Sequence, residues 1–181
     1  MATDVATRTW QIDPVHSSAA FAVRHLMISK VRGQFKEFSG TITTPANEII
    51  PTSIEATINA ASIDTREAQR DGHLRSADFF DVEHHPHITF KSSRITANGK
   101  DRFIAHGSLT MHGVTKQIEM PGQVEGQVKD PYGKDRAAYS ASLKLSRKEY
   151  GLVWNQAMET GGVMVGDDIE VTLEIEAVGD A

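Results

Sequence analysis

The chain has 181 residues, of which 39% are hydrophobic and 24% are charged, and this composition fits one globular domain with a core of its own. The formal net charge is −5 and no cluster of Lys and Arg occurs, so a nucleic-acid partner is excluded. The absence of cysteine excludes disulfides, zinc–thiolate sites and thiol nucleophiles.

The two ends of the chain frame a single domain. We expect a flexible N-terminus over residues 1–8 and one barrel domain over residues 9–179. No apolar run reaches the length of a transmembrane segment, and the opening MATDVATRTW lacks the basic start and apolar stretch of a secretory signal. The expected location is therefore cytoplasmic, or periplasmic if a leader has been removed.

The first half of the chain alternates with the period of a β-strand. In residues 17–25, Phe21 and Val23 share one face, and in residues 53–60, Ile54 and Ile58 share one face. Between these strands the apolar parity changes from odd to even positions near Lys36. A change of parity requires an extra residue, so we expect a bulge or a sharp bend there, as in a sheet that closes on itself.

Residues 62–90 interrupt this alternation. Asp64 and Glu67 have the spacing of a capping box, which predicts a short polar helix over about residues 65–77. The poor apolar face of this helix suggests that it lies across a surface or a mouth. Phe79 and Phe80 follow it and need an apolar surface to pack on, so they could plug one end of a barrel.

The second half returns to strands with one apolar face, separated by turn signals such as Asn98-Gly99. About eight long strands of this kind predict an all-β fold, an eight-stranded antiparallel up-and-down barrel, with a β-sandwich as the alternative. Small residues such as Ala56, Ala105 and Ala141 lie among the large ones on the inward faces. The pattern is compatible both with an internal cavity and with a solid core, because an eight-stranded barrel can be filled or can hold one small ligand.

Histidines suggest a second kind of site. His84, His85 and His87 fall within four residues, and imidazole is a common ligand of transition metals. No complete ligand spacing accompanies them, so a polar strand end is the favoured interpretation and a metal-binding protein the alternative. No nucleophile elbow or nucleotide-binding glycine motif occurs, and the sequence predicts no enzyme.

Several motifs, in order along the chain, resemble those of the YceI-like family of lipid- or polyisoprenoid-binding proteins. They are WQIDPVHSSAAFAVRHL, VRGQFKEFSGTI, ASIDTREAQRDGHLRSADFFDVEHHPHITF, HGSLTMHGVTK, SRKEYGLVWN and GGVMVGDDIEVTLEIEAV, which together span residues 10–178.

The resemblance implies a lipocalin-like barrel that transports or stores an isoprenoid or other long-chain lipid, without catalysis, as a homodimer and with no cofactor beyond the lipid. Strand parity, the segment of residues 62–90 and the loop before the last strand, read with these motifs, predict the following lipid-contacting residues: Phe21, Val23, Phe35, Phe38, Ile42, Ile58, Leu74, Phe79, Phe80, Phe90, Leu109, Leu143, Leu145, Trp154, Met158 and Met164. Residue type and the matched motifs give four candidates for contacting a lipid head group: His25, Arg70, His73 and Arg147.

Overall fold

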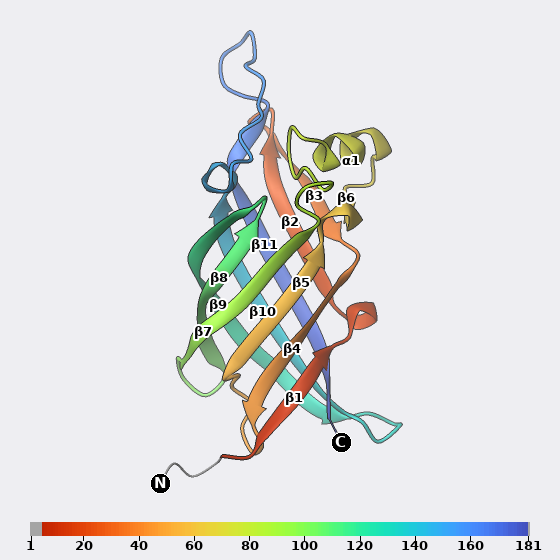
Figure 1. Cartoon of the computed structure of the whole chain (residues 1–181), viewed down its shortest axis with the longest axis vertical. Helices are drawn as coiled ribbons and strands as arrows, with labels where there is room; N and C mark the ends of the chain where they lie inside the picture. The colour runs from red at the N-terminus through yellow and green to blue at the C-terminus, as the bar shows by residue number, and fades with distance from the viewer. Residues whose placement is uncertain (1–4, 181) are drawn as a thin grey trace.

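Strands dominate the computed structural model, which describes residues 5–180 (Figure 1). One α-helix, α1 (Ala68–Arg75), and three short 3-10 helices, η1 (Pro14–His16), η2 (Ala60–Ser62) and η3 (Arg147–Tyr150), complete the described elements. The strands are β1 (Thr7–Ile12), β2 (Ser18–His25), β3 (Ser29–Phe35), β4 (Phe38–Pro45), β5 (Ser53–Asn59), β6 (Ile63–Asp64), β7 (His87–Ala97), β8 (Arg102–Met111), β9 (Val114–Lys129), β10 (Asp135–Ser146) and β11 (Val165–Gly179).

The strands form one antiparallel sheet that closes into a barrel. Strand β1 pairs with β4 on one side and with β11 on the other, where Trp10 lies opposite Gly179. Strands β1 and β2 follow each other along β11, and β3 and β4 likewise form two halves of one long bent strand. With the two-residue β6 set aside, the barrel has eight strand positions, and the prediction of an eight-stranded antiparallel barrel is confirmed.

The predicted bend lies between β3 and β4. Strand β3 ends at Phe35, β4 begins at Phe38, and Lys36 and Glu37 between them are not in a strand. Phe35 nevertheless packs against Phe21, and Phe38 pairs with Ile58 across the sheet. The bend therefore keeps both aromatic side chains directed inward although the two positions differ in parity.

Helix α1 is shorter than the predicted range of residues 65–77. It begins after Glu67, whose carboxylate accepts hydrogen bonds from the backbone N–H of Gln69 and of Arg70. Asp64, expected to cap the helix, instead accepts from the N–H of Arg66 at 2.9 Å in the preceding turn. The capping side chain is therefore the second acid of the motif, and the helix starts three residues later than expected.

The N-terminal expectation needs a similar adjustment. Strand β1 starts at Thr7, and the Arg8 guanidinium donates to the Asp135 carboxylate at 2.5 Å, so residues 7 and 8 belong to the barrel. Residues 1–4 lie outside the described part of the chain.

The two ends of the barrel differ. Helix α1, the β2–β3 turn and the loop before β11 gather at one end, called here the lid end, while the start of β1 and the end of β11 lie at the other (Figure 1). The far end is filled by a buried cluster that includes Trp10, Ile42, Phe103 and Tyr139. Among residues 5–180, no helix has the length and apolar character needed to cross a bilayer.

Candidate ligand-binding cavity

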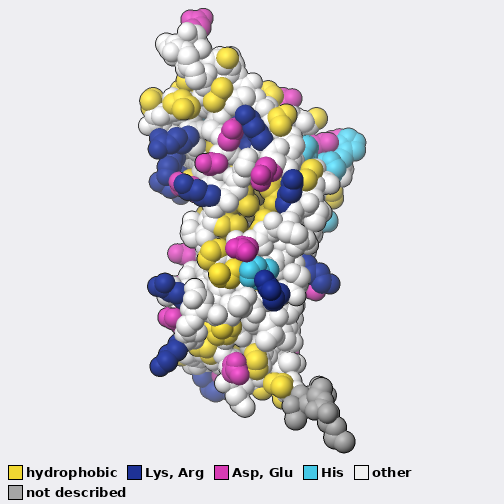
Figure 2. Space-filling view, turned by 90° about the vertical axis from the view of Figure 1, so that its left-hand side faces the viewer, with side chains coloured by type: hydrophobic (Ala, Val, Ile, Leu, Met, Phe, Trp, Pro, Cys, Tyr) yellow, Lys and Arg dark blue, Asp and Glu magenta, His cyan; other side chains and the backbone are white. Residues whose placement is uncertain are grey.

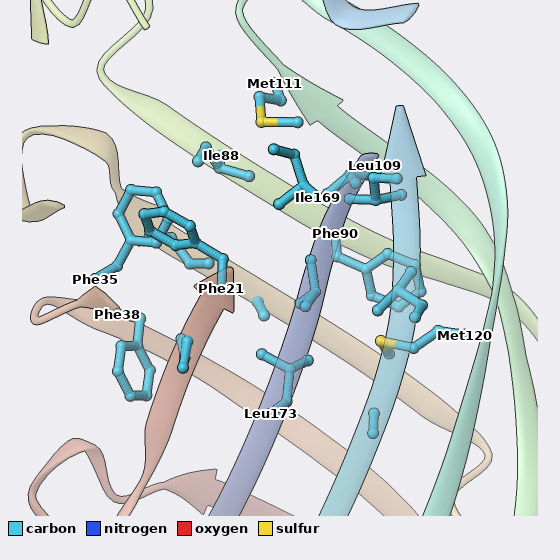
Figure 3. A pocket seen from close by; sticks show the side chains of 18 of the residues that line it. Phe21, Phe35, Phe38, Ile88, Phe90, Leu109, Met111, Met120, Ile169 and Leu173 are labelled. Carbon is cyan, nitrogen blue, oxygen red and sulfur yellow. The ribbon is translucent and has the colours of Figure 1, made fainter. Parts of the chain in front are cut away.

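The barrel encloses a cavity of about 260 Å³ between the lid end and the far cluster. Side chains from β2, β3, β7, β8, β9 and β11 converge on it in Figure 3. The only polar side chains that border it in the described structure are Ser39, Tyr139, Ser140 and Arg147, and it has no Asp, Glu, His or Lys in its wall. Such a lining offers contact to hydrocarbon and very few partners to water.

Most of the residues predicted to contact a ligand border this cavity. They come from strands that are distant in sequence, and the closure of the sheet brings their inward faces together. The residues placed at the wall are Phe21, Val23, Phe35, Phe38, Ile42, Ile58, Leu74, Phe79, Phe80, Phe90, Leu109, Leu143 and Leu145.

Aromatic side chains form the inner surface of the lid end. Phe35 packs between Phe21 and Phe80, with ring centroids 5.7 Å and 5.8 Å away, and the contact with Phe80 is edge-to-face. Leu74 of α1 reaches the cavity beside them. Helix α1 and the turn after it therefore close the barrel at this end, the position that the sequence predicted for this segment.

Trp154, Met158 and Met164 lie outside the cavity wall, unlike the other predicted lipid-contacting residues. The Trp154 ring packs on His73 and Phe79, with centroid distances of 4.7 Å and 5.3 Å, on the outer side of the lid. The Met164 carbonyl accepts a hydrogen bond from the N–H of Leu26 in the β2–β3 turn. Trp154 and Met164 therefore join the loop before β11 to the neighbouring lid segments, whereas Met158 bonds through its backbone to Gly161 and Gly162 of its own loop, which extends beyond the barrel end (Figure 1).

Arg147 borders the cavity but its guanidinium is already engaged. It is 3% exposed and donates to the carbonyl oxygens of Gly166, Leu152 and Trp154 at 2.7–2.9 Å. Burial lowers the pKa of Arg147, and the Asp167 carboxylate 4.0 Å away opposes that shift. The side chain thus fixes the loop before β11, which leaves little of it free for a ligand head group.

The other three head-group candidates lie away from the cavity wall. Arg70 donates to the side chain and the carbonyl of Thr65, both at 2.8 Å, and the His73 ring is 2.9 Å from the Asp78 carboxylate. His25 ends β2 and pairs with Ser29. Their contacts stabilise α1 and the neighbouring turns, and a head-group role for them stays a prediction.

One side of the barrel opens between β9 and β10. These strands are paired only from Asp135 and Lys129 up to Ala141 and Gly122. Beyond that point β9 continues to pair with β8, whereas Ser142–Ser146 of β10 pair with β11. Apolar side chains are visible between the charged ones on this side of the molecule (Figure 2). The cavity residues Ile118 and Leu143 flank this lateral opening.

Further wall residues had the same strand alternation as the predicted ones but were not named as ligand contacts. The inward face of β11, for example, runs along the cavity from Ile169 to Ile175. The strand alternation in the sequence shows that these side chains face inward. It does not show how far the open space extends along each strand. The additional large wall residues are Ile12, Ile54, Ile88, Phe103, Met111, Ile118, Met120, Tyr139, Val165, Ile169, Val171, Leu173 and Ile175 in strands, and Leu152, which follows η3.

The three histidines of the alternative metal-binding interpretation do not form one cluster in the described structure. His84 is exposed and contacts the Asp81 carboxylate at 2.9 Å, which raises the pKa of His84. His87 is exposed at the start of β7. His85 instead lies beside His112 of the β8–β9 turn, with ring centroids 5.0 Å apart. Adjacent residues in this tight turn point in different directions, so sequence proximity alone was a poor guide to this group.

The closed antiparallel barrel and its apolar interior define the chain as a lipocalin-like β-barrel with a cavity suited to an apolar small molecule. The model of the YceI-like domain matches residues 10–177. The chain therefore belongs to the YceI-like family, and the family assignment made from its motifs is confirmed.

Three comparisons place the chain within this group. It is 36% identical over 168 residues to a UPF0312 protein of Staphylococcus epidermidis, an alignment covering 92% of this chain and 95% of the relative. The crystal structure of BcnA from Burkholderia cenocepacia matches with a TM-score of 0.78 at 21% identity, over 91% of this chain and 98% of that one. A polyisoprenoid-binding domain from Saccharophagus degradans matches with a TM-score of 0.73 at 17% identity, over 94% and 98%. The last two similarities describe the fold.

Proposed function

We propose that the protein binds a long-chain apolar lipid, such as a polyisoprenoid, a prenyl quinone or a fatty acid, inside the barrel and serves as a carrier or store without catalysis. The observation that carries this proposal is the continuous apolar cavity of about 260 Å³ enclosed by the barrel. The polyisoprenoid-binding domain with the same fold supports a ligand of this class. The lack of a carboxylate or imidazole in the described wall supports binding over acid–base chemistry.

The size of the cavity sets the scale of the affinity. A volume of about 260 Å³ holds roughly nine methylene-sized groups at about 30 Å³ each. At about 0.8 kcal/mol per buried methylene, such a segment contributes roughly 7 kcal/mol before the costs of association. A longer tail would extend beyond this space, and the opening between β9 and β10 is the place where it could leave the barrel.

The lateral opening also supports a route for entry. The facing edges of β9 and β10 carry backbone N–H and C=O groups that the ladder between them does not use. Gln117 and Ser142 are exposed along these edges. A polar head group could be held there by hydrogen bonds while the tail lies in the apolar interior, which removes the need for a charged side chain inside the barrel.

The direct test is to identify what the protein carries. The protein is purified without detergent, and native mass spectrometry is followed by extraction into organic solvent and lipid analysis. We expect one lipid per chain with a long hydrocarbon tail. A protein that is repeatedly empty, and that also fails to bind prenyl quinones or fatty acids in titration, would refute the proposal.

A further inference from the structure

Asp81, His85 and His112 meet outside the cavity wall, at the lid end of the barrel. Asp81 and His85 belong to the turn that follows α1, and His112 belongs to the turn between β8 and β9. Each side chain is half-buried and offers one ligand atom, and these three atoms lie within 4.8 Å of one another. Figure 2 shows histidine side chains gathered on this flank of the barrel.

The turn after α1 sets the positions of Asp81 and His85. Asp81 has a φ of 47°, its N–H donates to the Ser76 carbonyl at 3.0 Å, and its own carbonyl accepts from the N–H of His85 at 2.9 Å. This i to i+4 bond forms one helical turn, in which side chains four residues apart lie on the same side. The turn thus brings the Asp81 carboxylate and the His85 imidazole to the same side, where their ligand atoms lie within 4.8 Å of each other.

His112 has a defined tautomer. Its Nδ1 lies 2.9 Å from the carbonyl oxygen of Tyr150, and a carbonyl oxygen can only accept, so Nδ1 carries the proton. Nε2 is then left with a lone pair. A histidine held through one nitrogen by a backbone carbonyl, with the other nitrogen free, has the outer-shell arrangement typical of metal-ligating histidines.

Two glycines make room for the two rings. A Cβ on Gly113 would lie 2.7 Å from Cε1 of His85, and a Cβ on Gly151 would lie 3.1 Å from Nδ1 of His112. Both glycines also have positive φ values, 73° and 75°, which side chains adopt with strain. The local backbone thus permits a close approach of two imidazoles that any other residue at these positions would obstruct.

We propose that Asp81, His85 and His112 bind a divalent transition-metal ion, with zinc as the best match. Two imidazoles and one carboxylate are a donor set used for zinc and other first-row metals, and three protein ligands leave one position for water. Zinc bonds of about 2.0–2.1 Å require ligand atoms roughly 3.3 Å apart. Small side-chain rotations bring atoms that now lie within 4.8 Å to that spacing.

The second group of this kind in the described structure has a different explanation. Asp13, His16 and Glu176 also bring ligand atoms within 4.8 Å of one another. The Arg136 guanidinium donates to Asp13 at 3.0 Å and to Glu176 at 2.7 Å, so a covalently attached cation already neutralises both carboxylates. Among residues 5–180, the ion pairs of Asp81 include no Lys or Arg, and its carboxylate contacts the exposed imidazole of His84 at 2.9 Å.

The position of the proposed site gives the ion a structural consequence. The turn that carries Asp81 also carries Phe79 and Phe80, and Met111, which precedes His112, borders the cavity as they do. An ion between the two turns would cross-link the lid to the β8–β9 hairpin. We expect the ion to raise the stability of the lid end whether or not a lipid is bound.

The test is metal binding by the full chain, freed of any affinity tag and treated with EDTA. Isothermal titration with zinc at pH 7.5 should give one ion per chain, and cobalt should give the visible absorption of a tetrahedral complex. Asp81→Asn, which keeps a residue tolerant of positive φ, and His85→Gln should each weaken zinc binding at least tenfold. His87→Ala removes an exposed histidine nearby and should leave the affinity unchanged.

The outcome is decisive in each direction because folding is measured separately. Circular dichroism melts without metal should place Asp81→Asn and His85→Gln close to the wild type. Zinc should raise the melting temperatures of the wild type and of His87→Ala, and should raise those of Asp81→Asn and His85→Gln much less. Failure of the wild type to bind zinc or cobalt would overturn the proposal. Zinc affinities of Asp81→Asn and His85→Gln equal to that of the wild type would also overturn it. So would a loss of zinc affinity in His87→Ala as large as the loss in those two variants. None of these readouts depends on the bound lipid.

Discussion

Leu143→Trp tests whether the cavity is the binding site. Leu143 lies on β10, opposite Val171, with its side chain in the cavity wall beside the lateral opening. Tryptophan has six more non-hydrogen atoms than leucine, and at the packing density of protein interiors they occupy about 60 Å³ more. This is roughly a quarter of the cavity volume of about 260 Å³. It removes space for about two methylene groups of a ligand.

At about 0.8 kcal/mol per buried methylene, the loss is about 1.6 kcal/mol, or roughly a fifteenfold weaker affinity. The added ring occupies open space, so we expect the free energy of unfolding without ligand to change by less than about 1 kcal/mol. Displacement of a fluorescent fatty acid gives the affinity, and urea unfolding gives the stability. Gln34→Trp, at an exposed position of β3 away from the lateral opening, is the control and should bind normally. Unchanged affinity in Leu143→Trp, or equal losses of binding and folding free energy, would show that the cavity is misassigned.

Three further predictions concern the barrel and its lid. The hydrogen bond from Arg136 holds the pKa of Asp130 below its usual value, so this pair stabilises the protein above about pH 3.9 and loses its effect as the pH falls below that value. Arg136→Gln should therefore be less stable than the wild type at pH 6, with the difference vanishing near pH 2. Gly107→Ala places a Cβ against the backbone of β7 and should cost about 2–3 kcal/mol of unfolding free energy in urea. Phe79→Leu removes the ring that packs on Trp154, and we expect a red-shifted Trp154 emission and faster release of a bound fatty acid in stopped-flow measurements.

Each of these predictions has its own control. Gly126→Ala adds a methyl group where no atom lies within 4 Å, so it should have little effect compared with Gly107→Ala. A stability difference between Arg136→Gln and the wild type that persists undiminished at pH 2 would mean that the ion pair is not its source. Identical emission and release rates in Phe79→Leu and the wild type would show that this ring does not hold the lid closed.

Strand alternation was enough to predict much of the barrel. A period of two fixes which side chains share a face, and the change of parity near Lys36 located the bend before any tertiary contact was known. The same alternation put Phe21, Phe90 and Leu143 on inward faces, and all three border the cavity. These features depend on neighbours along one strand, which is why the sequence carried them.

The first residue of the helix and the roles of the lid residues were harder to predict from the sequence. Asp64 and Glu67 are both residue types that can cap a helix, and the structure uses Glu67, while the N–H and hydroxyl of Thr65 between them donate to Asp71 of α1. Trp154 is a large aromatic residue, as expected of a lipid contact, but it lies outside the cavity wall. Both outcomes depend on contacts between the loops at the lid end, which no local pattern encodes.

The sequence by itself determined the family, the antiparallel barrel and the inward face of most strands, because these follow from short-range periodicity and from motifs read in order. Only the tertiary structure showed that the interior holds open space and that the pairing of β9 with β10 ends at Ala141. It also showed that the guanidinium of Arg147 donates its hydrogen bonds to backbone carbonyl oxygens. The contact between the rings of His85 and His112 was likewise visible only in the tertiary structure. The cavity, the separation of β9 from β10 and the contacts between side chains of distant strands depend on how segments far apart in sequence pack together. This packing is defined only once the sheet has closed into a barrel.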